Sequence, residues 1–190
     1  MTKLDPPTAH PPAHSSDDPT GRNPLEACAR RTERFVAASG WNQPPRLFSL
    51  VGTARLLAAE PQLTGALGAP AAGEISEQIS SIEQEGWIEQ LGRVNDLDGL
   101  FAALAWPPEV DGAALAIERA VAPHGELDPA APHPDDPSPA EVRLFVAVLR
   151  DGSGTCLLRQ RAHDADHLVA SGPEIAPTLL DALAGTLRAE

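Results

Sequence analysis

Two apolar segments joined by a turn place the strongest constraint on the fold. EVRLFVAVLR (141–150) and TCLLRQRAH (155–163) are separated by Asp-Gly-Ser-Gly, a strong β-hairpin signal. A three-residue loop, Gly152-Ser153-Gly154, with Gly154 in the left-handed conformation, pairs Val148 with Leu158 and Val146 with Gln160. We therefore expect the chain to fold around an antiparallel sheet.

Period-two alternation divides the hairpin into two faces. The apolar face, expected to be core, carries Val142, Leu144, Val146, Val148, Cys156 and Leu158. The opposite face carries Arg143, Phe145, Ala147, Leu149, Leu157, Arg159, Arg161 and His163, with Arg161 opposite Phe145 and His163 opposite Arg143. A two-residue loop would bring arginines across from the apolar face, so segregation of charge favours the longer loop.

The charged face of the hairpin is a candidate anion-binding site. It gathers Arg143, Arg159, Arg161 and His163 on a protein that is acidic overall. Guanidinium groups bind carboxylates and phosphates through paired hydrogen bonds, so a small anion or an acidic peptide fits this chemistry. The alternative is internal neutralisation by Glu118, Glu141 or an acidic loop, because arginines on one strand commonly face acids on the next. The sequence leaves both open.

The segment HDADH is the one metal-like cluster, with His163, Asp164, Asp166 and His167 as possible ligands. Histidine and carboxylate suit zinc or manganese. In a strand the two aspartates point away from the two histidines, so a solvated turn is the alternative. The sequence has no G-x-S-x-G, no H-E-x-x-H and no phosphate-binding glycine loop, and no cofactor is predicted. Whether the protein is an enzyme stays open.

Charge and composition narrow the classes of partner. The 190 residues include 27 acidic and 14 basic side chains, giving a formal net charge of −13. Nucleic acid and anionic membrane are therefore poor partners, because both carry phosphate that an acidic surface repels. No segment reads as a membrane helix or a signal peptide, and Cys28 and Cys156 form no disulfide framework, so a cytoplasmic location is expected.

Proline and acidic residues mark the limits of the folded part. Residues 1–24 are expected to be a disordered tail, and residues 122–140 a proline-rich acidic loop inside a single domain over 25–190. Asn23-Pro24 predicts the start of a helix that runs to about Ser39. Its buried stripe is expected to hold Leu25, Cys28, Thr32, Phe35 and Val36. A second helix is expected from near Pro177.

Four stretches resemble a family of small uncharacterised proteins of high-GC Gram-positive bacteria. They are WNQPPRLFSLVGTARLLAAEP at 41–61, IEQE at 82–85, LAWPPEVDGAALAIER at 104–119, and EVRLFVAVLRDGSGTCLLRQRAHDAD through GPEIAPTLLDALAGTL at 141–187. The resemblance covers about residues 25–188 and implies no assigned activity. The family pattern implies strands at 78–84 and 113–121, in addition to the strand that the residues themselves predict at 46–51.

The predicted fold is a single α+β domain. A mainly antiparallel sheet of about five strands is expected, with the N- and C-terminal helices packed on one face. The favoured function is a non-enzymatic interaction or adaptor module, because no nucleophile and base converge in the sequence. The alternative is a small-anion or metal-binding domain, with metal-assisted hydrolysis at the HDADH segment as its enzymatic form. The partner is expected to be another protein or a small anionic ligand, and the sequence does not predict an oligomeric state.

Overall fold

A computed structural model describes residues 23–65, 78–86, 99, 101–102, 104–121 and 140–188 of the chain. The tail expected at 1–24 and the loop expected at 122–140 lie outside the described residues, except at their C-terminal ends. The fold below is therefore that of the described part.

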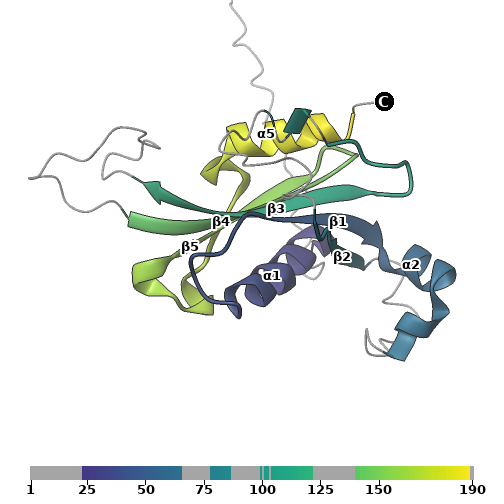
Figure 1. Cartoon of the computed structure of the whole chain (residues 1–190), viewed down its shortest axis with the longest axis horizontal. Coiled ribbons are helices and arrows are strands. Elements are labelled where there is room, and N and C mark those ends of the chain that lie inside the picture. Colours follow the sequence, from purple (N-terminus) through teal and green to yellow (C-terminus); the bar gives the residue numbers. More distant parts are fainter. Residues whose placement is uncertain are drawn as a thin grey trace, which may run out of the picture.

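A single antiparallel sheet organises the described part, with strand order β2-β1-β3-β4-β5-β6 (Figure 1). The strands are β1 (Arg46–Gly52), β2 (Ile79–Glu83), β3 (Gly112–Val121), β4 (Ala140–Leu149), β5 (Gly154–Gln160) and β6 (Ala170–Ser171). The α+β class is confirmed, as are the strands expected near 46–51, 78–84 and 113–121. The sheet has six strands and not five, because β6 spans two residues and is too short to show a periodicity.

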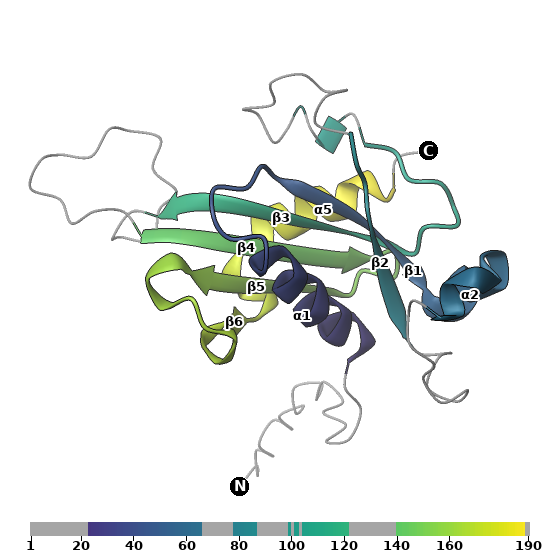
Figure 2. The same ribbon diagram turned by 60° about the horizontal axis from the view of Figure 1, so that its bottom comes forward.

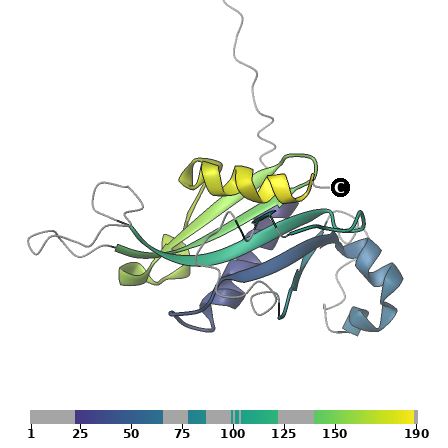
Figure 3. The ribbon, with the colours of Figure 1, turned by 45° about the horizontal axis from the view of Figure 1, so that its top comes forward.

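Different helices cover the two faces of the sheet. Helix α5 (Pro177–Thr186) packs on the face that carries Leu115 and Val146, and helix α1 (Pro24–Ala37) on the face that carries Phe48 and Phe145. Figures 1 and 3 show the two helices on opposite sides. The prediction that both lie on one face is wrong. The run LFVAVL of β4 supplies buried side chains to both faces, so each face needs a helix.

Helix α1 begins where the sequence predicts. The Asn23 side chain accepts a hydrogen bond from the Leu25 amide at 3.0 Å, and Pro24 is the first helical residue. Leu25, Cys28, Thr32 and Val36 are buried as expected, whereas Phe35 is 56% exposed. Consecutive residues of a helix lie about 100° apart, so Val36 and Phe35 cannot share one narrow stripe. The burial predicted for Phe35 is therefore wrong.

The β4–β5 hairpin has the predicted type of loop at a different position. Leu149 N donates to Ser153 O at 2.8 Å and Gly152 N to Leu149 O at 3.0 Å, so the three loop residues are Arg150-Asp151-Gly152. Gly152, with φ +90°, takes the left-handed position predicted for Gly154. The Asp151 carboxylate accepts a hydrogen bond from Ser153 N at 2.8 Å and so favours this turn.

The position of the loop changes the pairing but not the faces. Val146 pairs with Cys156 and Arg143 pairs with Arg159, so every predicted partner is displaced by four residues. Because the displacement is even, each side chain keeps its predicted face. Arg161 and His163 lie beyond the end of β5 and face neither Phe145 nor Arg143, which corrects the predicted pairs.

Short helical segments complete the described part. They are α2 (Thr53–Ala59), η1 (Pro61–Gly65), η3 (Arg161–His163), η4 (Asp166–Leu168) and η5 (Pro173–Ile175). The segment that holds η3 and η4 lies on the same side of the sheet as α1 and leads into β6 (Figure 2). None of the described helices has both the length and the apolar character needed to cross a membrane.

Candidate functional site

Arg159 is the centre of a buried charged cluster beside α1. Its side chain is 3% exposed and forms a paired contact with Glu33 of α1, with Nε to Oε1 at 2.6 Å and Nη2 to Oε2 at 2.8 Å. Asp164 and Asp166 accept further hydrogen bonds from it at 2.9 and 2.7 Å. These bonds, first that with Glu33, raise the pKa of Arg159 against the opposing effect of burial. The guanidinium is permanently charged, and each of its three nitrogens donates to a carboxylate.

Arg143 lies next to Arg159 on the neighbouring strand and is 2% exposed. Its Nη2 donates to Glu118 Oε1 at 2.8 Å and to the carbonyl oxygen of Gly40. The same Glu118 carboxylate accepts hydrogen bonds from the amides of Asn42 and Gln43, at 2.8 and 3.4 Å. Glu118 therefore fixes both Arg143 and the turn that follows α1.

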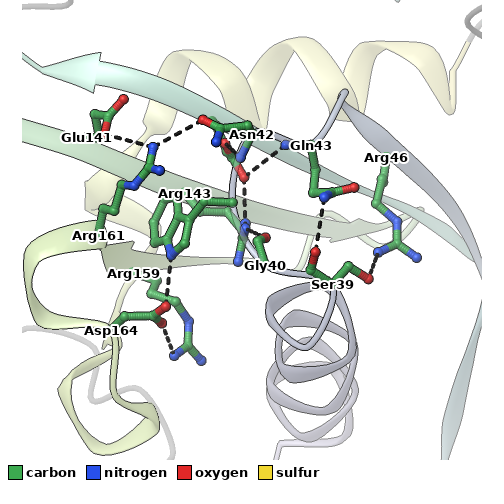
Figure 4. A network of polar contacts seen from close by, with 12 residues as sticks. Ser39, Gly40, Asn42, Gln43, Arg46, Glu141, Arg143, Arg159, Arg161 and Asp164 are labelled. Carbon is green, nitrogen blue, oxygen red and sulfur yellow. Dashed lines mark hydrogen bonds and ion pairs between the residues drawn. The ribbon is translucent and has the colours of Figure 1, made fainter.

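Trp41 joins the cluster through its ring and its nitrogen. The guanidinium carbons of Arg143 and Arg161 lie 4.5 and 5.7 Å from the centre of the indole, distances at which cations are attracted to the ring. The indole Nε1 donates to Asp164 Oδ2 at 2.8 Å. This hydrogen bond, followed by the contact with Arg159, lowers the pKa of Asp164. Figure 4 shows the cluster near the C-terminal end of α1.

We call this cluster the arginine network. It contains the three arginines of the predicted anion site but not His163. It comprises Arg143, Arg159 and Arg161 with Glu33, Glu118, Glu141, Asp164 and Asp166. Arg161 contacts Glu141 at 2.9 Å, and with the Arg143 contact to Glu118 this is the internal neutralisation that the sequence left open. His163, in η3, is exposed, and its side chain has no hydrogen-bond partner among the described residues.

Carboxylates outnumber guanidinium groups in the arginine network by five to three. These carboxylates bind most of the guanidinium donors, although the buried Nη1 of Arg143 has no hydrogen-bond partner among the described residues. A cavity of about 140 Å³ beside the network is itself lined by Glu118 and Glu141 together with Trp41, Arg119 and Ala120. Anion binding here stays a prediction, which a thermal-shift screen of sulfate, phosphate and dicarboxylates on the wild type and on Arg159→Ala/Arg161→Ala would test.

The side chains of the predicted metal ligands do not converge on one point. Asp164 and Asp166 turn to Arg159, while His163 and His167 are exposed in η3 and η4. Within the described ranges, no three His, Cys, Asp or Glu side chains are arranged to hold a metal ion. The metal site also stays a prediction.

Both cysteines lie inside the fold and face different helices. Cys28 packs in the cluster under α1 and Cys156 in the cluster under α5. Burial is the largest cause of the raised pKa of each thiol. A nucleophilic cysteine needs a lowered pKa and access to substrate, so neither residue has the setting of a catalytic thiol.

The exposed face of α1 was not predicted from the sequence. We call it the α1 surface and define it by Arg30, Arg31, Arg34 and Phe35. A cavity of about 160 Å³ adjoins it, lined by Arg30, Glu33, Arg34, Leu157, Asp166 and Val169. The spacing of the three arginines on one helical arc was the available signal, but assigning Phe35 to the buried stripe concealed it.

Comparison with protein-family models matches residues 25–188 to the family described as PPA1309-like protein. No curated protein and no solved structure matches the chain.

Proposed function

The chain belongs to the PPA1309-like protein family, a membership that assigns it no reaction, and we propose that it is a non-enzymatic protein-interaction module. The α1 surface carries this proposal. Phe35 is 56% exposed, and the guanidinium of Arg46 lies 4.8 Å from its ring centre. Phenylalanine and arginine are among the residues that are enriched at protein interfaces relative to the rest of the surface.

The chemistry of the arginine network supports an interaction role over catalysis. A general base needs a carboxylate or imidazole within reach of a substrate proton, and a nucleophile needs an activating partner. Each of the five carboxylates of the network is already bound to an arginine. The network is therefore suited to fixing α1 on the sheet, which keeps the α1 surface rigid for a partner.

The setting of the protein is also part of the proposal. We place it in the cytoplasm of a high-GC Gram-positive bacterium, where thiols stay reduced. Two buried, unpaired cysteines support such a compartment. Fractionation of the native cells tests this location.

Site-specific photocrosslinking tests the proposed function. A benzophenone amino acid replaces Phe35 in the full chain, expressed in the native cells, and Thr178 on the exposed side of α5 serves as the control position. We expect a discrete protein adduct from position 35 that is absent from position 178. The captured protein, once purified, should bind the wild-type chain and lose affinity for Phe35→Ala. Identical adducts at both positions, or none at position 35, would exclude the α1 surface as the interface.

A further inference from the structure

Two arginines of the α1 surface have unused hydrogen-bond donors. Arg34 donates through Nε to the Arg30 carbonyl at 3.2 Å, and no described residue accepts from its two terminal nitrogens. Arg31 donates through Nη2 alone, to the Ile79 carbonyl at 2.8 Å. Arg30, in contrast, is bound to Glu26 and Ser171. Arg31 and Arg34 are thus anchored at one point each, with the rest of the guanidinium directed to solvent.

The positive charge of these two arginines has no counterpart on α1 itself. The two acidic residues of the helix are Glu26, paired with Arg30, and Glu33, paired with Arg159. On a chain with a formal charge of −13, the α1 surface is therefore locally cationic. A carboxylate is the complementary group, because the planar guanidinium binds it through two parallel hydrogen bonds.

The cavity beside α1 adds a place for an apolar side chain. Leu157 and Val169 form the apolar part of its lining. Arg30 and Arg34 line it together with Glu33 and Asp166, two carboxylates that are already bound to Arg159. Its volume of about 160 Å³ matches that of a cavity known to accept a benzene ring, about 150 Å³. A side chain the size of leucine or phenylalanine can occupy it while neighbouring carboxylates reach Arg34 and Arg31.

We propose that the α1 surface binds an acidic segment of a partner protein, which places one apolar side chain in the α1 cavity and carboxylates on Arg31 and Arg34. This inference rests on the proposed function and specifies the chemistry of the partner. A basic segment would be repelled by the two arginines, although the net charge of the whole chain attracts it. A nucleic acid has phosphates for the arginines, but the acidic remainder of the protein repels it.

Selection from a random dodecapeptide phage library on the immobilised full chain tests this proposal. We expect enrichment of peptides that combine Asp or Glu with Leu or Phe. Enrichment of lysine- and arginine-rich peptides, which net charge alone predicts, would overturn the proposal, and so would the absence of any enriched sequence. Binding of a labelled single-stranded oligonucleotide in place of the peptides would overturn it as well.

Variants of the α1 surface then locate the binding. The affinity of the best selected peptide, measured by fluorescence anisotropy, should fall at least about tenfold in Arg31→Glu/Arg34→Glu, which removes two charge-assisted contacts. Arg55→Glu/Arg188→Glu, at two exposed arginines outside α1, changes the net charge by the same amount and should alter affinity by less than about twofold. Equal losses in the two variants would mean that the peptide responds only to overall charge.

A milder variant keeps the test valid if the double substitution disturbs the fold. Arg34→Gln removes the unused donors and leaves the sheet contacts of α1 intact, and its circular dichroism should match that of the wild type. Unchanged affinity in Arg34→Gln would overturn the role of Arg34. Crosslinking from Phe35 to a partner that has no acidic segment would overturn this inference while leaving the proposed function standing.

Discussion

The two faces of the sheet are stabilised by different kinds of interaction. The face under α5 is apolar, with Leu115, Val146 and Cys156 fully buried against Leu183. The face under α1 carries both apolar side chains, such as Phe145, and the charged side chains of the arginine network. Both faces lie on the same strands, so strand propensity does not distinguish them.

The difference shows what each face requires of its sequence. An apolar face needs hydrophobic side chains of suitable size, and many combinations satisfy it. A buried charged face needs specific partners, because an uncompensated charge in the interior costs more than the pair contributes. The loss of stability from substituting a buried charge on the α1 face should therefore be compensated only by changing its partner as well. On the α5 face, the loss of stability should depend on the polarity and volume of the new side chain.

Val146→Asp should have the largest effect. Val146 has no exposed surface, and the new carboxylate would be buried under α5 without a partner. The cost should exceed the roughly 0.5–3 kcal/mol of ordinary substitutions and leave the chain unfolded or insoluble. Circular dichroism and the soluble fraction measure this, with Thr178→Asp on exposed α5 as the control. A soluble, folded Val146→Asp protein would contradict the assignment of this face.

Arg159→Ala should have the next largest effect. It leaves the buried Glu33 carboxylate without its paired contact, and removal of one partner of a buried pair typically costs about 3–5 kcal/mol. Urea denaturation measures the loss. The double variant Glu33→Leu/Arg159→Met, which removes both charges, should recover most of it. Arg55→Ala, at an exposed pair with Asp111, should cost about 1 kcal/mol or less.

If Arg159→Ala and Arg55→Ala lost equally little unfolding free energy, the buried ion pairs of the α1 face would contribute no more to stability than an exposed pair. If Glu33→Leu/Arg159→Met failed to recover stability, Asp164 and Asp166 would carry more of the effect than Glu33. Each outcome changes the contrast between the two faces in a defined way.

The α5 face was predicted far better than the α1 face. Alternation along the hairpin identified Val146 and Cys156 as core, because burial of apolar side chains depends on local sequence. The loop position was missed because both Gly152 and Gly154 fit a turn, and the choice depends on the Asp151 to Ser153 hydrogen bond and on Leu180 packing against Gly154.

The arginine network was predicted in part. Glu118 and Glu141 were named as partners of the hairpin arginines in the alternative to anion binding, since neighbouring strands bring them close. Glu33 was not expected, because it lies 126 residues from Arg159 in sequence and reaches it only when α1 packs on the sheet. The prediction that both helices pack on one face also gave no reason to expect Glu33 of α1 next to Arg159.

Arg161→Ala should have a smaller effect than Arg159→Ala within the same network. Arg161 is 38% exposed and its partner Glu141 more so, and exposed pairs are screened by solvent. With the contact to Trp41 included, we expect a loss of roughly 1 kcal/mol or less in urea denaturation. A loss as large as that of Arg159→Ala would mean that burial does not set the order of effects in the network.

The pH dependence of Asp164 should give the smallest effect. The indole of Trp41 and the guanidinium of Arg159 hold its pKa below the ordinary aspartate value of about 3.9. The unfolded chain therefore takes up this proton before the folded chain does as the pH falls. The resulting stabilisation is complete above the unfolded pKa and is lost as the pH falls through the folded pKa.

Asp164→Asn keeps the shape of the side chain and removes its titration. Because the side chain is 42% exposed, the variant should lose less than about 1 kcal/mol of unfolding free energy at pH 7. The difference from the wild type should shrink as the pH falls below about 4 and vanish once Asp164 is protonated in the folded state. Asp181→Asn, on the exposed side of α5, is the matched control for the loss of one carboxylate. A constant difference across the acid range would mean that Asp164 contributes through its shape and not its charge, which would remove it from the ionic part of the α1 face.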